Sequence, residues 1–216
     1  MLTELPFEAL LFDLDGTLVD SAAVVVGTWR WWAVRHGLEL SRILAVSHGR
    51  PTIETMREVA LHLATDDEAR EFLEREVEDI EGLKPVPGAF ELLRSLTPDR
   101  WGVVTSCSRN LAEVRLRACG LPVPDVLVTA DQVTYGKPHP EPYLAGAGRL
   151  GRAPADCVAF EDAPAGIASA RAAGMTVIGL ATTLSAAELD CELCVRDLRA
   201  VSVDGYNGRL ALRIEV

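Results

Sequence analysis

The strongest constraint on the fold lies near the start of the chain, where an apolar run over residues 9–12 ends in two carboxylates, Asp13 and Asp15, followed by Gly16 and Thr17. An apolar run of this length is typical of a strand buried on both faces of a parallel sheet. Ligands bind at the carboxyl edge of such sheets. Alternate side chains of a strand share one face, so Asp13 and Asp15 are predicted to lie together at that edge.

Two carboxylates on one face raise the free-energy cost of ionising each other. A divalent cation would offset this repulsion, and Mg²⁺ suits it because Mg²⁺ accepts carboxylate, carbonyl and substrate phosphate oxygens together. Gly16 permits a turn that a side chain would obstruct, and the Thr17 hydroxyl can hold a neighbouring carboxylate. The alternative is a pair of solvated acids at the start of a loop, against which the full Asp-x-Asp-Gly-Thr pattern argues.

Residues 12–21 read Phe-Asp-Leu-Asp-Gly-Thr-Leu-Val-Asp-Ser. This stretch resembles the first motif of the haloacid dehalogenase superfamily of phosphohydrolases, and later motifs extend the resemblance over nearly the whole chain. The likeness is greatest to the sugar-phosphate phosphatases of that superfamily, which include hexitol and deoxysugar phosphate phosphatases. It implies a Rossmann-like core that carries an inserted α-helical cap over the active site.

A run of helical patterns without strand signals follows the first motif, over residues 22–36, 41–46, 52–64 and 66–81. Helices between two strands indicate an insertion, which in the resembled family is the cap. The sequence Lys-Pro-Val-Pro-Gly over 84–88 marks its exit and makes a natural hinge. We therefore expect an α/β core of residues 1–17 and 87–216, and a helical cap of residues 18–86.

From residue 89 the pattern changes to alternating helices and strands, which is typical of a doubly wound parallel sheet. The C-terminal segment instead alternates like a β-hairpin over residues 201–214, which we interpret as an addition to the edge of the sheet. The helices are expected at 90–96, 111–119, 143–150 and 165–173, and the strands at 101–105, 126–129, 157–160 and 176–180.

The strand end at 103–108 brings hydroxyl groups and free backbone N–H groups to the same edge of the sheet. Such an end can hold a phosphate oxygen, or its hydroxyls can simply cap the next helix. In the resembled family this position supplies the phosphate-binding Ser or Thr. The register favours Ser106, with Thr105 as the alternative. Leu14 and Cys107, beside these motifs, are included among the predicted phosphate- or substrate-binding residues.

Lys137 lies between Gly136 and Pro138, which hold it more rigidly than a lysine on a helix surface. A fixed ammonium group suits the neutralisation of both Asp13 and a phosphate. A lone Lys-Pro is more often a solvated lysine. Its position corresponds to the third motif of the resembled family, which favours the functional interpretation.

Glu161 and Asp162 end another apolar strand, at 157–160. Together with Asp13 and Asp15 they would place four carboxylates in one pocket, which favours a Mg²⁺ site. By resemblance, Asp162 is the better direct ligand, and Glu161 acts through water or by holding a ligand in place. The alternative is that one of these acids only caps the following helix.

These residues suggest a mechanism for phosphate monoesters. Asp13 attacks phosphorus to form an aspartyl-phosphate, and Asp15, kept protonated by acidic neighbours, protonates the leaving alkoxide and then activates water. Lys137, the Ser106 hydroxyl and Mg²⁺ stabilise the transferring phosphoryl group. The predicted function is a phosphatase for small sugar or polyol phosphates. Two alternatives remain: a sugar phosphomutase resembling β-phosphoglucomutase that uses the same residues, and a non-catalytic phosphate-binding protein.

A turn in the expected cap carries His48 and Arg50 on either side of a glycine. A closing cap can bring such a turn against the leaving group, where both residues would donate hydrogen bonds to sugar hydroxyls. The alternative is that Arg50 pairs with Glu54 on the cap surface and that His48 packs locally.

The net charge of −11 argues against binding nucleic acid or an anionic membrane. The chain has no basic region followed by a long apolar stretch and no run as long as a membrane span, so we expect a soluble, cytoplasmic protein, and a monomer. Its five cysteines are scattered and expected to be reduced. The single pair Cys191 and Cys194 lacks a second pair for zinc.

Overall fold

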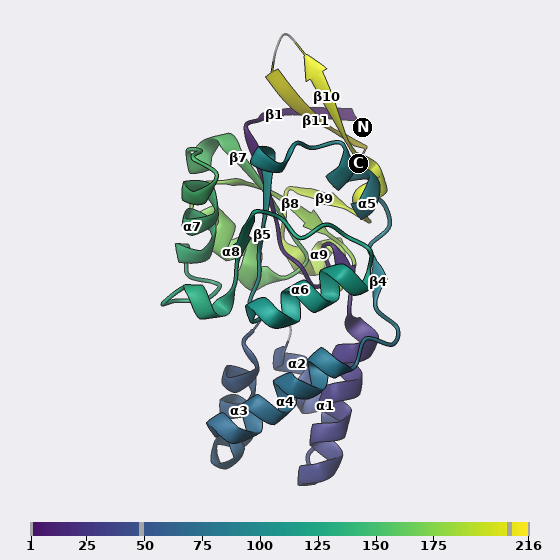
Figure 1. The fold of residues 1–216 in the computed structure, drawn as a ribbon, viewed down its shortest axis with the longest axis vertical. Helices are drawn as coiled ribbons and strands as arrows, with labels where there is room; N and C mark the ends of the chain where they lie inside the picture. The colour runs from purple at the N-terminus through teal and green to yellow at the C-terminus, as the bar shows by residue number, and fades with distance from the viewer. Residues whose placement is uncertain (1, 48–49, 207–208, 216) are drawn as a thin grey trace.

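The computed structural model describes residues 2–47, 50–206 and 209–215, and its centre is a six-stranded parallel sheet (Figure 1). The strand order is β6-β5-β2-β7-β8-β9, so the first strand of this sheet in the sequence is central and later strands are added outward on both sides. This confirms the predicted doubly wound α/β fold. The strands are β2 Ala9–Phe12, β5 Trp101–Val104, β6 Val126–Val128, β7 Cys157–Glu161, β8 Thr176–Leu180 and β9 Leu193–Val195.

The central strand β2 is buried on both faces, which explains its unbroken apolar sequence. Leu10 and Phe12 face one hydrophobic cluster, and Ala9 and Leu11 face the other. Helices α5 Ala89–Arg94 and α6 Arg109–Ala118 contribute to the first cluster. Helices α7 Glu141–Arg149 and α8 Pro164–Ala172 contribute to the second. The sheet thus has helices on both sides, and its carboxyl edge faces the helical end of the molecule (Figure 1).

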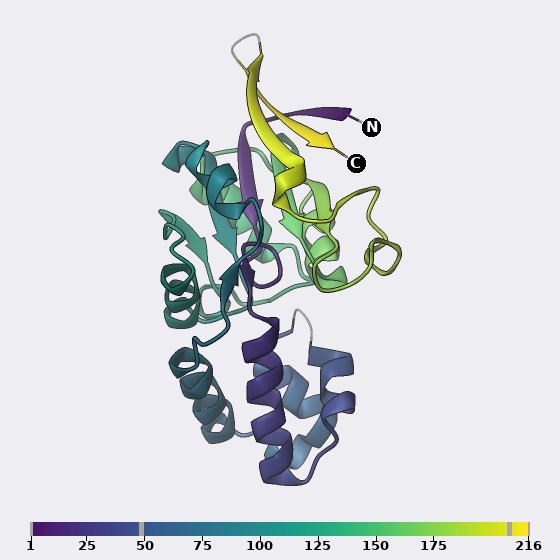
Figure 2. The ribbon, with the colours of Figure 1, turned by 90° about the vertical axis from the view of Figure 1, so that its right-hand side faces the viewer.

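Four helices gather at that end of the molecule and pack around their own hydrophobic cluster (Figures 1 and 2). The Trp29 and Phe72 rings lie 4.2 Å apart, centroid to centroid, in this cluster. We call this helical insertion the cap and retain 18–86 as its proposed extent. The helices are α1 Ala22–His36, α2 Leu40–Ser47, α3 Thr52–Ala60 and α4 Asp66–Glu78.

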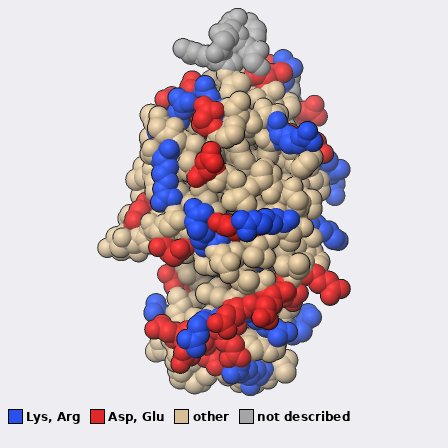
Figure 3. All heavy atoms as spheres, in the orientation of Figure 1, with Lys and Arg blue, Asp and Glu red and all other residues tan. Residues whose placement is uncertain are grey.

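Helix α1 matches the predicted 22–36 and ends where Gly37 adopts the left-handed conformation that favours glycine. Two other cap helices are shorter than predicted. The pattern at 52–64 divides into α3 and a short 3₁₀ helix, Leu61–Leu63, and α4 ends at Glu78 rather than at residue 81. Acidic side chains from this acidic part of the sequence form a band over the cap surface (Figure 3).

The chain enters and leaves the cap through two short paired strands, β3 Val19–Asp20 and β4 Lys84–Pro85. They run antiparallel, with Val19 opposite Pro85 and Asp20 opposite Lys84. The sequence carries no strand signal here because a strand of two residues is too short to show alternation. The predicted hinge segment therefore begins as one half of a two-stranded connection.

The C-terminal hairpin forms as predicted, from β10 Val201–Tyr206 and β11 Arg209–Glu215, but its predicted place was wrong. It does not extend the main sheet. It pairs with β1, Leu2–Phe7, in a separate three-stranded sheet of order β1-β11-β10, at the end of the molecule opposite the cap (Figure 2). One edge strand of the parallel sheet is β9, which follows the short helix α9, Ala186–Leu189. The sequence analysis predicted neither of these, nor β1.

Within the described residues, none of the helices combines the length and the apolar character that crossing a lipid bilayer requires.

Candidate active site

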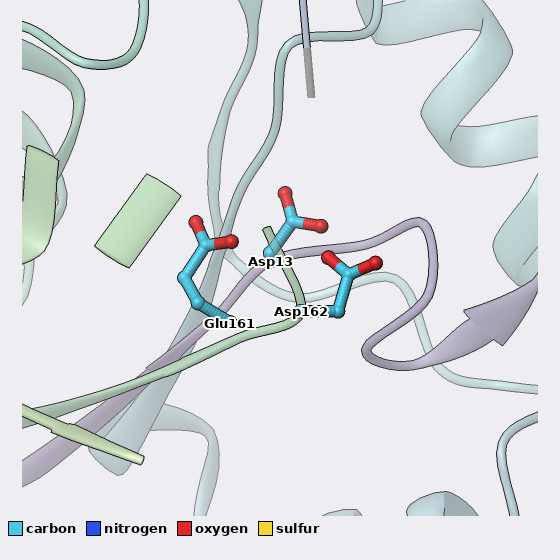
Figure 4. Close-up of side chains that lie close together, drawn as sticks. All are labelled: Asp13, Glu161 and Asp162. Carbon is cyan, nitrogen blue, oxygen red and sulfur yellow. The ribbon is translucent and has the colours of Figure 1, made fainter. Parts of the chain in front are cut away.

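Three buried acids meet at the carboxyl edge of the sheet, where β2 and β7 end side by side. Asp13 follows β2, Glu161 is the last residue of β7, and Asp162 follows it. Each offers a carboxylate oxygen, and these oxygens lie within 4.8 Å of one another. Figure 4 shows the three carboxylates directed to the same side of the strands. The structure thus brings together Asp13, Glu161 and Asp162, as the strand-end argument predicted.

Lys137 is buried against this acidic cluster. Its Nζ lies 2.5 Å from Asp13 Oδ1 and 2.7 Å from Glu161 Oε1, and it also donates to the Val104 carbonyl at 3.0 Å. Burial by itself would lower the pKa of Lys137, but the negative charges of Asp13 and Glu161 outweigh it and raise that pKa above its ordinary value. Lys137 is therefore a fixed cation beside Asp13.

One ammonium group does not balance three carboxyl groups. Burial, with Glu161 and Asp162 adding and Lys137 opposing, raises the pKa of Asp13 well above its usual range. Burial and the charge of Glu161 likewise raise the pKa of Asp162, to about 7. The donors at this point are all oxygens, and the charge is in excess on the negative side. That combination fits a hard divalent cation of the Mg²⁺ type.

Close backbone contacts hold the acids in place. A Cβ on Gly16 would lie 2.0 Å from Asp162 Oδ2, and a Cβ on Gly166 would lie 2.0 Å from Glu161 Oε1, so both sites exclude a side chain. Tyr143 Oη donates to Glu161 Oε1 at 2.5 Å, and Thr183 Oγ1 donates to Asp162 Oδ2. The carboxylates therefore have little freedom to rearrange.

Asp15 has different surroundings. Its Oδ1 accepts a hydrogen bond from Ser21 Oγ at 2.6 Å, and its Oδ2 accepts from Arg115 Nη1 at 2.7 Å and from Cys107 Sγ at 3.0 Å. Two expectations need correction. Four carboxylates were expected to cluster, but the side chain of Asp15 lies apart from the group of Asp13, Glu161 and Asp162. Acidic neighbours were expected around Asp15, but its nearest charged neighbour is the cation Arg115. The reason is that β2 ends at Phe12, so strand alternation no longer places Asp15 on the face of Asp13.

Arg115 continues from Asp15 into the cap, where its Nη2 donates to Glu76 Oε1 at 3.0 Å. Burial raises the pKa of Glu76, with Arg115 opposing and Asp15 adding to the shift. The sequence analysis missed both residues. A signal existed in the helical spacing, because Arg115 lies four residues after the buried Leu111, and Glu76 lies four residues after the buried Phe72. Each charge therefore falls on the apolar face of its helix.

Ser106 and Thr105 both line the cavity above the acids. Thr105 is buried, and its Oγ1 accepts a hydrogen bond from the Cys107 N–H at 3.1 Å, which commits it to the local turn. The Thr105 hydroxyl can still donate its own proton, so Ser106 and Thr105 both remain candidates for the contact with phosphate. The side chain of Leu14 is fully buried in the core, so any contact of Leu14 with a substrate would come from its backbone.

The predicted cap residues have mixed outcomes. His48 lies outside the described residues. Arg50 lines the cavity and forms an ion pair with Glu58, so the alternative of a pair with Glu54 is wrong in its partner. Arg50 is exposed at the rim.

A cavity of about 530 Å³ lies between the core and the cap. Its floor carries Asp13, Asp15 and Lys137. Apolar side chains of α1 and α2 line the cap side: Val25, Val26, Trp29 and Leu44. A concave site of this size, with charged groups on the floor and apolar side chains on the cap side, suits a small molecule that carries a charged end.

Comparison with known proteins agrees with this geometry. The model of the haloacid dehalogenase-like hydrolase family matches residues 7–174. Hexitol phosphatase A of Escherichia coli is 43% identical over 202 residues, with 91% of this chain and 94% of the relative covered. Glycerol-1-phosphate phosphohydrolase 2 of Saccharomyces cerevisiae is 36% identical, with 94% and 87% covered.

Among solved structures, a β-phosphoglucomutase from Clostridium difficile superposes with a TM-score of 0.77 at 26% identity, with 89% of this chain and 92% of that chain covered. The family match spans more than half of the chain, and the phosphatase relatives are similar over most of it. The chain therefore belongs to the haloacid dehalogenase-like hydrolase family.

Proposed function

We propose that the protein is a Mg²⁺-dependent phosphatase that hydrolyses small sugar or polyol phosphates through an aspartyl-phosphate on Asp13. The observation that carries the proposal is the placement of Asp13 among Lys137, Glu161 and Asp162, with Asp15 beside it in a different environment. A nucleophile and a proton-transfer group two residues apart can act on opposite ends of one phosphate ester bond.

In the first step, a carboxylate oxygen of Asp13 attacks phosphorus as the ester oxygen departs. Lys137 stabilises the negative charge on the phosphoryl oxygens. It also keeps Asp13 oriented, because its Nζ donates a hydrogen bond to Asp13 Oδ1. Ser106 lines the cavity two residues after β5 ends and would donate to a phosphoryl oxygen. The leaving alkoxide takes a proton from Asp15.

In the second step, Asp15 accepts a proton from a water molecule that attacks the phosphorus of the aspartyl-phosphate. The product is inorganic phosphate, and Asp13 is restored. Asp15 thus loses a proton to the alkoxide in the first step and regains one from water in the second, so the cycle needs no other acid.

Asp13 and Asp162 would hold the Mg²⁺, and Glu161 would keep these ligands and Lys137 in place. When bound, the ion supplies positive charge that neutralises the phosphate and the excess of carboxylates. This assignment rests on the oxygen-only donor set and on the raised pKa values of Asp13 and Asp162.

The cavity and the relatives support the proposed substrate class. The cavity of about 530 Å³ accepts a small phosphorylated molecule. The relatives named above are a hexitol phosphatase and a glycerol-1-phosphate phosphohydrolase. A monomer in the cytoplasm is part of the proposal, and the five free cysteines fit a reducing compartment.

A phosphomutase is the second candidate, because a β-phosphoglucomutase shares the fold over most of both chains. The deciding experiment incubates the protein and Mg²⁺ with hexitol, glycerol and hexose phosphates, and measures free phosphate and rearranged sugar phosphate separately. We expect stoichiometric free phosphate. Rearranged hexose phosphate without free phosphate would support the mutase, and neither product would contradict both functions.

A further inference from the structure

A buried chain of ion pairs connects the proton-transfer group to the cap. It runs from Asp15 at the end of the first motif, through Arg115 on α6, to Glu76 on the cap helix α4. We infer that Arg115 is a positioning residue that fixes the carboxylate of Asp15 for proton transfer, and that Glu76 makes this fixation depend on the cap. The inference rests on the proposed function, since it assigns a way of controlling the same site.

The guanidinium of Arg115 is almost completely enclosed, with the side chain 2% exposed. Nη1 donates to Asp15 Oδ2 at 2.7 Å and to Cys107 Sγ at 3.2 Å, and Nη2 donates to Glu76 Oε1 at 3.0 Å. Its Nε is buried without a partner among the described residues. A planar group held at both ends has one orientation available, so it also fixes the atoms it contacts.

Other arginines on α6 serve a different purpose. Arg109 and Arg117 are exposed and pair with Glu113 on the same helix. Figure 3 shows basic and acidic side chains side by side over this surface. Pairs of this kind contribute little to stability. Arg115 therefore stands apart in its burial and in its partners, although all three arginines share one helix.

The link to the cap is equally distinct. Among the ion pairs of the described residues, Arg115 with Glu76 is the one that joins the cap to the core. The side chain of Glu76 is 7% exposed, so removal of Arg115 would leave the buried carboxylate of Glu76 without its cation. An outward movement of α4 would separate this pair. The cap position that completes the cavity is thus also the position in which Arg115 is held at both ends.

The contacts give the two oxygens of Asp15 different tasks. Oδ2 receives two donors, the Cys107 thiol and the Arg115 guanidinium, and the guanidinium has no acceptor atom. Oδ1 receives the Ser21 hydroxyl, which can rotate and become an acceptor. Arg115 thus occupies Oδ2, which leaves Oδ1 as the oxygen that we assign to the exchange with the leaving group.

The test compares two leaving groups, because a poor leaving group needs the proton of Asp15 and a good one does not. Arg115→Met and Arg115→Lys are assayed in the first turnover, as the rate of hexitol release from a hexitol phosphate and of nitrophenol release from p-nitrophenyl phosphate, because the later hydrolysis of the aspartyl-phosphate needs Asp15 whatever the leaving group. We expect Arg115→Met to lower the first-turnover rate for the hexitol phosphate by on the order of 10²-fold, with less than about a tenfold loss for p-nitrophenyl phosphate and little change in the steady-state KM. Arg115→Lys should recover part of the loss, and Arg117→Met is the matched control that changes neither rate.

Glu76→Gln tests the cap half of the chain of ion pairs while keeping the shape and leaving Arg115 in place. It should lower the first-turnover rate in the same leaving-group-dependent way, by less than Arg115→Met does. The double variant should be no worse than Arg115→Met alone, because both changes act through the same group. Additive losses would show that Glu76 acts independently and would overturn its assigned role.

Equal losses on both substrates, or no loss from Arg115→Met, would overturn the inference while leaving the phosphatase function in place. If Arg115→Met does not fold by circular dichroism, Arg115→Lys and Glu76→Gln decide the question by the same ratio of rates. If the parent protein releases no phosphate from any ester, the proposed function fails first and the inference falls with it.

Discussion

The two acids of the first motif are two residues apart, yet they are held in different ways. Asp13 is surrounded by groups that all come from the ends of core strands or from the segments that follow them, and its charged neighbours lie in direct contact. Asp15 is held by Ser21 before the first cap helix, by Arg115 on a core helix and, through Arg115, by the cap. Asp13 is therefore held by the core alone, whereas Asp15 is held by the core and, through Arg115, by the cap.

This difference suits the two roles. A nucleophile needs one position relative to phosphorus, and rigid strand ends provide it. A proton-transfer group must meet the leaving group, which is the part of the substrate that the cap encloses. The predictions below test this division, beginning with the change that should have the largest effect.

Asp13→Asn should abolish turnover of every substrate, by on the order of 10⁴-fold or more, because the amide is a poor nucleophile of nearly the same shape. Steady-state phosphate release measures the loss, and circular dichroism checks that the fold persists. An activity within tenfold of the parent would remove Asp13 from the role of nucleophile.

Asp15→Asn should separate substrates by leaving group. We expect a loss of roughly 10²- to 10⁴-fold with sugar and polyol phosphates, since the alkoxide then leaves without a proton. The formation of the aspartyl-phosphate from p-nitrophenyl phosphate, followed as a burst of nitrophenol, should fall much less. Similar burst losses on Asp15→Asn and Asp13→Asn would show that the two acids do not have distinct roles.

Removal of Mg²⁺ with a chelator should stop turnover, and added Mg²⁺ should restore it. Asp162→Asn should weaken the apparent Mg²⁺ affinity by about 10- to 100-fold, because it removes a carboxylate from the acidic cluster. A Mg²⁺ titration of activity measures this, with Asp99→Asn on the far surface as the control. Full activity after exhaustive chelation would contradict the metal assignment.

The smallest effect is expected at the rim of the cap. Arg50→Ala and His48→Ala should lower activity on sugar phosphates by about tenfold relative to p-nitrophenyl phosphate, as expected for a lost hydrogen bond to a substrate hydroxyl. Equal activity on all substrates would mean that Arg50 serves only its pair with Glu58. Glu58→Ala is the matched control, because it breaks that pair and leaves Arg50 in place.

The sequence was most informative where local chemistry and strand geometry coincide. The strands β2, β7 and β8 are largely apolar, and the acids of the cluster lie at the end of β7 or directly after β2 and β7. Parallel strands bring their carboxyl ends to one edge, so Asp13, Glu161 and Asp162 were predicted to meet without any knowledge of the fold's details.

The remaining features depend on partners that are distant along the chain. Leu2–Phe7 becomes a strand because it pairs with β11, with Leu2 opposite Glu215, and no local pattern states this. Arg115 differs from Arg117 in its surroundings, since Asp15 lies 100 positions away in the sequence. Helical spacing shows that Arg115 shares a face with buried residues, but only the packing of α4 against α6 shows what its charge meets.

The paired strands β3 and β4 have a consequence for the evolution of such proteins. Because the chain leaves the core and returns to it through neighbouring strands, the intervening segment is a module with adjacent ends, which can be lengthened, shortened or exchanged without rethreading the core. Changes in this segment can then alter the substrate selectivity of the enzyme while the reaction chemistry of the core is conserved. The contact between Glu76 and Arg115 limits this exchange, since a transplanted module must bring a carboxylate to the same place.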